Sequence, residues 1–273
     1  MRNDEFEVFN SEFFRPYAVR YNIVYQYLDL IEQAFVDEEK MIIVLFPIQK
    51  PFLIWTDENL DLKKKERYLL DLLKIVEHHK IKVKEVHGKK GDLEIFFRLY
   101  EKKYSLSYKF DEELVSYSAL QLIIPPKKGK LIKASNKHCM VLAEFINKFE
   151  QDALHYSQPM EKSIARSQSF IKIGNAYLWE DNENITAMGV IWEQSKHIGR
   201  INYIYVDNRF RKKGYAKMLV ASLGEILQSQ NRLPVLYAAK NYTHSNKVYK
   251  SVGFEEGGEL HLAYALDVEG VEI

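Results

Sequence analysis

Basic residues surround a glycine where a strand is expected to end and a helix to begin, in the segment from Val206 to Ala216. Arg211, Lys212, Lys213 and Lys217 cluster around the expected start of the helix. Free N–H groups at the start of a helix bind anions, and cations there are unfavourable unless an anion offsets them. Gly214 and Ala216 are small enough to let a phosphate approach the backbone. The segment predicts a phosphate-binding turn, although a solvated turn with a capping glycine fits the charges and spacing equally well.

A second motif follows this turn in the sequence. The turn reads Arg211-x-x-Gly214-x-Ala216, and the second motif reads Ser245-Asn246-x-x-Tyr249-x-x-x-Gly253-Phe254. In this order, and each on the expected kind of element, the two motifs resemble those of the GNAT N-acetyltransferase superfamily. The resemblance covers about residues 129–266. A divergent first half followed by such a domain is similar to the layout of a group of bacterial GNAT proteins.

The resemblance implies an α+β fold, in which a mixed, mostly antiparallel sheet is flanked by helices and its fourth and fifth strands splay apart. It implies acetyl-CoA as cosubstrate, with the pantetheine arm between those strands, and no metal. The residues it assigns to the arm are Ile204, Tyr205, Val206, Tyr249 and either Asn241 or Asn246, and those it assigns to the pyrophosphate are Arg211, Lys212, Lys213, Gly214, Tyr215 and Ala216. One extra residue lies between Asn241 and Asn246 compared with the family's usual Asn-x-x-Ser-Asn, which leaves the contact of Asn241 open.

Tyr249 is the residue to which the resemblance assigns the proton donor for the departing thiolate. A tyrosine with a pKa of about 10 is protonated at neutral pH, so it can supply that proton. The alternative role for Tyr249 is packing against Phe254 in the core.

The general base is less well defined, because many family members have a glutamate where this chain has Arg200. Glu193 is the candidate that we take as the base, at the end of the preceding strand. Glu180, Asp181 and a chain of water molecules are the alternatives.

Two functions are compatible with these motifs. The resemblance implies an enzyme that transfers an acetyl group from acetyl-CoA to a primary amine directly, in a ternary complex, and a backbone amide near Val206 could stabilise the carbonyl oxygen. The alternative is a CoA-binding sensor or scaffold without turnover, which Arg200 and the extra residue near Asn241 would favour. The sequence does not specify the acceptor.

Pro125-Pro126 and the basic stretch after them predict a domain boundary, because two prolines continue neither a helix nor a central strand. We expect an α+β domain at residues 1–126, which the resemblance suggests is a degenerate GNAT-like unit, and the GNAT domain at residues 127–273. Ten of the 12 glycines follow the prolines, and the formal charge is −3 for the first half and +4 for the second. The second half is therefore expected to hold the ligand.

The spacing of apolar residues predicts helices and strands in both halves. In the first half, helices are expected at about 19–35, 60–77 and 93–103, and strands at 41–46, 52–55, 82–86, 104–110 and 117–124. In the second half, helices are expected at about 136–149, 160–173, 215–228 and 245–251, and strands at 131–132, 176–180, 185–193, 200–206, 234–239, 254–256 and 260–266.

The composition is that of a globular protein. Of 273 residues 47% are hydrophobic, and the net charge of +1 argues against a general nucleic-acid binder. The single cysteine, Cys139, excludes an internal disulfide and a cysteine-based zinc site and fits a reducing, cytoplasmic compartment. We expect neither a secretory signal nor a membrane span. The expected partners are acyl-CoA and an amine, with neither nucleic acid nor a membrane, and a homodimer is left open.

Overall fold

The chain folds into two compact units. The computed structural model describes residues 9, 12, 14–27, 31–37, 42–47, 51–78, 80–104, 106–155, 157–193 and 195–266. Unit 1 comprises Met1–Ser116 and Gly258–Ile273, and unit 2 comprises Tyr117–Gly257. The chain thus enters unit 2 before Pro125-Pro126, and its last strand returns to unit 1.

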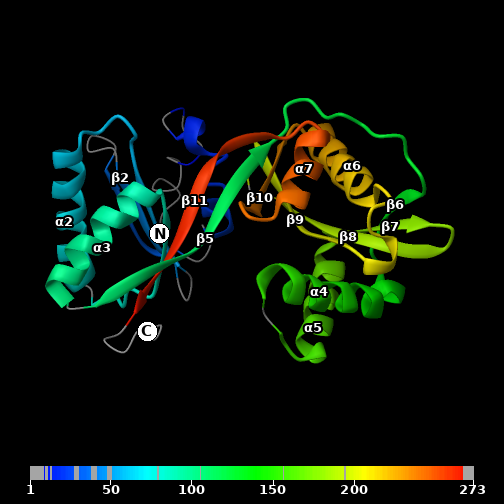
Figure 1. Ribbon diagram of the computed structural model, residues 1–273, viewed down its shortest axis with the longest axis horizontal. Helices are drawn as coiled ribbons and strands as arrows, with labels where there is room; N and C mark the ends of the chain where they lie inside the picture. The colour runs from blue at the N-terminus through cyan, green and yellow to red at the C-terminus, as the bar shows by residue number, and fades with distance from the viewer. Residues whose placement is uncertain are drawn as a thin grey trace. The chain divides into compact units, whose positions relative to one another are not determined.

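Unit 1 is a mixed sheet with two long helices. Its elements in chain order are η2 (Arg15–Tyr17), α1 (Val24–Tyr27), β1 (Ile31–Asp37), β2 (Ile42–Pro47), β3 (Phe52–Thr56), α2 (Leu62–His78), β4 (Glu85–Gly88), α3 (Lys90–Tyr104), β5 (Ser107–Ser118) and β11 (Glu255–Leu266) (Figure 1). The strand order is β1-β2-β3-β4-β11-β5, in which β3 and β4 are parallel. Every residue of β3 is buried, because Ile54 packs among α2 and α3 while the ring of Trp55 lies 4.9 Å from that of Tyr17.

The expected helix over residues 19–35 is wrong for its second half. α1 ends at Tyr27, and Ile31–Asp37 pairs with Ile42–Pro47 as an antiparallel hairpin. In general, residues four positions apart share one face of a strand as well as one face of a helix, so the spacing of apolar residues does not distinguish the two. The backbone hydrogen bonds that β2 offers decide between the two.

Two pairs of expected short strands are each replaced by one long strand. Strand β5 covers residues 107–118 where 104–110 and 117–124 were expected, and β11 runs without interruption through Gly257-Gly258. Residues 119–129 form neither a helix nor a strand. Their backbone is bonded within unit 2 instead, where Ile123 N–H donates to the Val252 oxygen over 3.1 Å.

Unit 2 places helices on both faces of its sheet. Its elements are β6 (Lys130–Lys133), η4 (Asn136–His138), α4 (Cys139–Leu154), α5 (Met160–Ile173), β7 (Ala176–Asp181), β8 (Asn184–Glu193), β9 (Ile198–Val206), η5 (Asn208–Phe210), α6 (Tyr215–Ser229), β10 (Leu233–Ala239) and α7 (Thr243–Ser251). The strand order is β6-β7-β8-β9-β10, antiparallel except for the last pair. Helices α4 and α5 lie on one side of these strands and α6 and α7 on the other (Figure 1).

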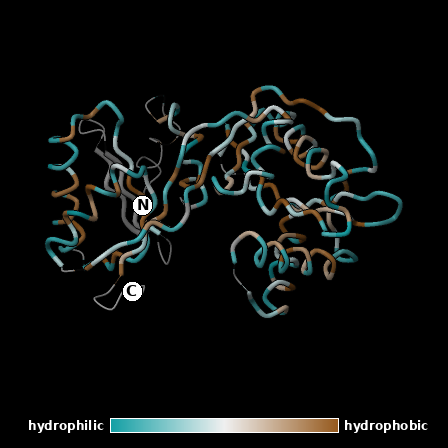
Figure 2. Tube along the Cα trace, in the orientation of Figure 1, coloured by the Kyte–Doolittle hydropathy of each residue, from teal (hydrophilic) through white to brown (hydrophobic). Residues whose placement is uncertain are grey.

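The apolar faces expected in unit 2 form its core. Leu142, Phe145 and Ile146 of α4 are buried against strands β7, β8 and β9, and hydrophobic residues recur along these elements (Figure 2). Helix α5 ends at Gly174, whose φ of 76° is the left-handed conformation that glycine adopts at a helix C-terminus. This core confirms the helices and strands expected between residues 131 and 251.

Candidate functional site

Strands β9 and β10 separate after a short paired stretch. They pair in parallel at three positions, the last of which joins Arg200 to Val235. Strand β9 then runs on for six residues to Val206, and β10 for four residues to Ala239. An extended molecule can pair with such exposed strand edges as another strand would. The sheet thus contains the expected splay, and Ile204, Tyr205 and Val206 are the last three residues of β9.

A bulge lies at the start of the open part of β9. Asn202 is opposite Val190 of β8, whereas Tyr205 is opposite Met188, so β9 carries one extra residue. Tyr203 takes up the difference with a φ of 52°, and its N–H donates to Asn202 Oδ1 over 2.8 Å. A bulge bends the strand and changes the direction of its backbone groups. Sequence reasoning missed Tyr203, for which the neighbouring asparagine is the available signal.

A buried polar network connects Tyr203 to helices α4 and α5. The Arg166 guanidinium donates to the Tyr203 hydroxyl over 3.0 Å and forms an ion pair with Glu150. Glu150 is 1% exposed and also accepts a hydrogen bond from Gln158. Burial raises the pKa of the Glu150 carboxyl. The network fixes the Tyr203 side chain, and with it the bulge, against the two helices.

The turn after β9 is organised by Asp207. Its Oδ1 accepts the Arg209 N–H over 2.9 Å, and its main-chain oxygen accepts the Phe210 N–H over 2.8 Å. Hydrogen bonds from the Arg209 side chain hold the pKa of the buried Asp207 carboxyl below its usual value. Asp207 therefore sets the path by which the chain reaches the start of α6.

The start of α6 is open to solvent. Gly214 is the N-cap with a φ of 86°, and a Cβ built on it would meet no atom within 4 Å. Lys212 and Lys213 are exposed beside it, whereas the Tyr215 side chain is buried and donates to Asp181 over 2.6 Å. The first N–H groups of the helix have no partner within the helix itself. This region can bind an anion through its backbone and its two lysines.

The side chain of Arg211 lies along the end of β9. Its Nε donates to the Val206 oxygen over 3.1 Å, and its other end donates to Asp152 over 2.7 Å. The guanidinium is also 5.5 Å from the centre of the Tyr205 ring. Arg211 thus occupies the main-chain oxygen of the last residue of β9.

Tyr242, the residue after Asn241, also contacts Asp152. The Tyr242 hydroxyl donates to the Asp152 main-chain oxygen over 2.8 Å and lies 3.3 Å from His155 Nε2. Asp152, at the end of α4, therefore contacts Arg211 after β9 and Tyr242 after β10. We call these three residues the clasp. Sequence reasoning noticed the extra residue but not Asp152 or Tyr242.

Asn246 and Asn241 differ in their surroundings. Asn246 Nδ2 donates to the main-chain oxygens of Ala239 and Lys240, over 3.3 and 3.2 Å, which closes the turn after β10. Its Oδ1 is buried and has no hydrogen-bond partner among the described residues. Asn241 is exposed. Asn246 is therefore the better placed of the two to accept a hydrogen bond from a ligand.

Tyr249 lies on α7 and is 7% exposed. Burial raises the pKa of its hydroxyl to about 12, against which a hydrogen bond with Ser245 acts. Its ring is 5.9 Å from that of Tyr117 and 6.5 Å from that of Phe254. The hydroxyl is thus held protonated at any physiological pH, and the expected packing against Phe254 is present as well.

The candidates for the base have different environments. Glu193 is the last residue of β8, and its side chain is outside the described part of the chain. The hydrogen bond from Tyr215 holds the pKa of Asp181 below its usual value, which suits an anion and not a base at neutral pH. Glu180 pairs with Lys130 over 3.0 Å. Arg200 is 4% exposed, and its guanidinium is 6.0 Å from the centre of the Tyr237 ring.

Residues 141–254 match the sequence profile of a family described as the Acetyltransferase (GNAT) family. This chain therefore carries a GNAT acetyltransferase domain. The matched residues run from α4 through the turn at Gly214 to Phe254, so they include both motifs. A comparison with curated proteins found no match.

Solved GNAT structures share the fold over most of this chain. An acetyltransferase of the GNAT family from Colwellia psychrerythraea has a TM-score of 0.56 at 12% identity, covering 91% of this chain and 96% of its own. A GCN5-related N-acetyltransferase from Kribbella flavida has a TM-score of 0.57 at 11% identity, covering 89% and 92%. One from Sphaerobacter thermophilus has a TM-score of 0.56 at 12% identity, covering 87% and 84%. The GNAT fold expected from the sequence is thereby confirmed.

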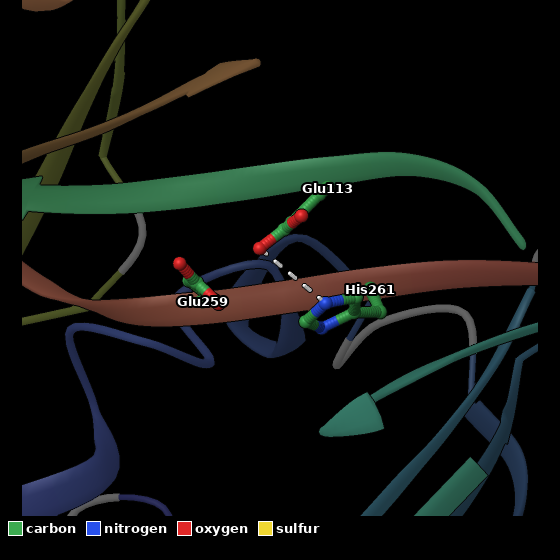
Figure 3. A group of neighbouring side chains, drawn as sticks. All are labelled: Glu113, Glu259 and His261. Carbon is green, nitrogen blue, oxygen red and sulfur yellow. Dashed lines mark ion pairs between the residues drawn. The ribbon is translucent and has the colours of Figure 1, made fainter. Parts of the chain in front are cut away.

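One group of side chains outside this site resembles a set of metal ligands. Glu113 of β5 and Glu259 and His261 of β11 bring their ligand atoms within 4.8 Å of one another (Figure 3). His261 Nε2 is 3.7 Å from Glu113 Oε1, which is an ion pair when the histidine is protonated.

The described part of the chain has no helix long and apolar enough to cross a membrane.

Proposed function

We propose that this chain is an acyl-CoA-dependent N-acetyltransferase, which transfers an acetyl group from acetyl-CoA directly to a primary amine. We place the transfer in residues 127–273 and the protein in the cytoplasm. The observation that carries the proposal is the separation of β9 from β10 beyond Arg200 and Val235, which leads to the open, glycine-capped start of α6. An extended thiol arm and a diphosphate require these two features next to each other.

The residues of the site fit acyl-CoA. The open space at Gly214 leaves room for a phosphate that a Cβ would crowd, and Lys212 and Lys213 supply positive charge. The buried Oδ1 of Asn246 can accept from an amide N–H of the arm. Ile204 to Val206 offer the backbone edge for the rest of the arm. Bound acyl-CoA supplies a thioester, which is an activated acyl group.

The chain's own residues then act on the acceptor and on the departing thiolate. The protonated amine first loses a proton. Its nitrogen then attacks the carbonyl carbon of the thioester, so that the C–N bond forms and the C–S bond breaks. Tyr249 holds a proton on its hydroxyl until the thiolate takes it, and burial keeps that proton in place beforehand. Backbone N–H groups after the bulge at Tyr203 are suited to stabilise the carbonyl oxygen. Glu193 remains our candidate for the group that takes the proton of the amine.

The experiment is a turnover assay of the full chain. We expect thiol release from acetyl-CoA with at least one member of a panel of amino acids, polyamines, aminoglycosides and peptides, and we expect Tyr249→Phe to slow it. Binding of acetyl-CoA without turnover on any amine would favour the sensor, for which Arg200 in place of the family's glutamate is the specific observation. A protein that does not bind acetyl-CoA at all would exclude both the enzyme and the sensor.

A further inference from the structure

The element order of unit 2 recurs in unit 1. Along the chain, the antiparallel strands β7, β8 and β9 of unit 2 precede α6, then β10 parallel to β9, and α7. The 12-residue strand β11 follows α7 and continues into unit 1. In unit 1 the antiparallel strands β1, β2 and β3 precede α2, then β4 parallel to β3, α3 and the 12-residue strand β5. The same order and strand directions identify β3, α2, β4 and α3 as the counterparts of β9, α6, β10 and α7.

The turns after the two counterpart strands begin alike. Asp57, next after β3, accepts the N–H of Asn59 on Oδ1 over 2.7 Å, as Asp207 accepts that of Arg209 over 2.9 Å. The main-chain oxygen of each aspartate accepts the N–H three residues on. Both aspartates are buried, at 4% and 2% exposed. The match in detail supports the assignment of unit 1 as a second copy of this part of the fold.

The turns then differ at the anion site. Helix α2 begins five residues after Asp57, whereas α6 begins eight residues after Asp207, so unit 1 lacks three residues of the basic turn. Asp61 precedes α2, and its Oδ1 accepts the Lys64 N–H over 2.9 Å. A carboxylate at a helix N-terminus satisfies the same N–H groups that would otherwise bind a phosphate. Asp61 therefore fills in unit 1 the position that is open at Gly214.

In unit 1 the space beyond the paired stretch of β3 and β4 is also closed. After its last pair with β3, β4 continues for one residue only, and a Cβ on that Gly88 would lie 2.8 Å from the Ile54 oxygen. Just beyond, Asp92 of α3 accepts from Thr56 at the end of β3 over 2.7 Å and from Lys65 of α2 over 3.0 Å. Thr56 and Asp92 are 1% exposed and Lys65 is 8% exposed. These contacts join β3, α2 and α3 where the counterparts in unit 2 leave an open edge.

We infer that unit 1 is a copy of the acyl-CoA-binding fold whose slot is closed by the chain's own carboxylates, so that the chain binds acyl-CoA in unit 2 alone. A second acyl-CoA would have to displace Asp61 from α2 and separate the Thr56–Asp92–Lys65 contacts, and its diphosphate would face both carboxylates. The inference rests on the proposed function for the site in unit 2.

The test is calorimetric titration of the full chain with CoA. We expect one site per chain, no binding by Gly214→Glu, and one site with unchanged affinity for the unit 1 variant Asp61→Asn. The double variant Lys212→Glu, Lys213→Glu should also prevent CoA binding in unit 2, because it reverses two exposed charges and leaves the glycine turn unchanged. A thermal melt of each variant checks its fold. Two sites, or one site left in the folded blocked variants, would overturn the inference. No binding by the unsubstituted protein would overturn the proposed function and the inference that rests on it, whereas two sites would overturn the inference alone.

Discussion

Asp152 forms an ion pair with Arg211 over 2.7 Å while Arg211 donates to the oxygen of Val206, the last residue of the open strand edge. Both side chains of the pair are 47% exposed, so the pair itself contributes little to stability. Its position matters, because it holds a guanidinium against the Val206 oxygen, at the strand edge proposed for the acyl-CoA arm. The pair also keeps a negative charge near the proposed anion-binding turn.

Asp152→Asn should therefore tighten the binding of CoA. The substitution removes a negative charge near the proposed anion-binding turn and frees Arg211 to contact the diphosphate. An exposed pair of this kind is worth about 0.2–1 kcal/mol, which is a change in Kd of roughly 1.4-fold to fivefold. Calorimetry at low and high salt measures it, and the gain should shrink at high salt. Asp71→Asn, which breaks the exposed pair with Lys74 on α2, is the matched control. Weaker binding by Asp152→Asn would show that the clasp supports the ligand.

Tyr249→Phe should lower kcat by about 100-fold or more while the Kd of CoA stays within about twofold, because a positioned proton donor contributes roughly 10²–10⁴ to the rate. The ring that packs against Phe254 and Tyr117 is kept, so the fold should be unaffected. Tyr68→Phe in unit 1 is the control. An unchanged kcat would remove Tyr249 from the chemistry and leave it a packing role.

Deprotonation of Tyr249 should cause no fall in kcat up to about pH 10. Burial raises the pKa of its hydroxyl to about 12, so the donor remains protonated throughout that range and loses its proton only near pH 12. A profile of kcat from pH 6 to 10, with the acceptor at saturation, tests this. An alkaline limb that Tyr249→Phe abolishes would contradict the raised pKa.

Gly214→Ala should destabilise the turn by about 1 kcal/mol or more and weaken CoA binding, because alanine is strained at a φ of 86°. Gly91→Ala is a matched control in α3, where a Cβ meets nothing within 4 Å and alanine is a better helix former than glycine. Urea unfolding of both variants and CoA titration give the comparison. Equal stability changes in the two variants would argue against the strained turn.

Asp92→Ala should lower the free energy of unfolding by about 3–5 kcal/mol, since it leaves the buried Lys65 ammonium without its carboxylate. Asp71→Ala, which breaks an exposed pair, should cost less than about 1 kcal/mol. The number of CoA sites in the folded Asp92 variant should remain one. Urea denaturation followed by titration measures both quantities, and a small loss for Asp92→Ala would contradict the buried network.

Acid should destabilise the protein partly through Asp207. Its pKa is lowered in the folded state, so its contribution to stability is full above the unfolded pKa of about 3.9 and is lost as the pH falls through the lower folded value. Glu150 has the opposite sign, because its raised pKa makes the folded state bind a proton more readily. Asp207→Asn should flatten the acid limb of stability against pH, and Glu150→Gln should steepen it. The reverse pattern would contradict these directions.

Signals within short stretches of sequence were sufficient to predict most helices and strands of unit 2. The amphipathic helices, the glycine turn and the tyrosine of the second motif each depend on residues within a few positions of one another, so spacing predicted them. In unit 1 the same reasoning failed at Ile31–Asp37, because residues four apart share a face in both kinds of element and the partner strand made the choice. The proposed base stays a prediction.

The amino-acid sequence by itself determined which residue types stand at the glycine turn before α6 and on α7, since motif spacing is a property of the chain. Only the tertiary structure decided that β9 parts from β10, that Asp152 reaches both turns, and that Asp92 joins three elements of unit 1. These relationships join residues far apart in the chain, and their geometry depends on how strands pair and helices pack. The two units illustrate this dependence, because the same order of elements leaves β9 and β10 apart in unit 2, whereas side-chain contacts join β3, α2 and α3 in unit 1.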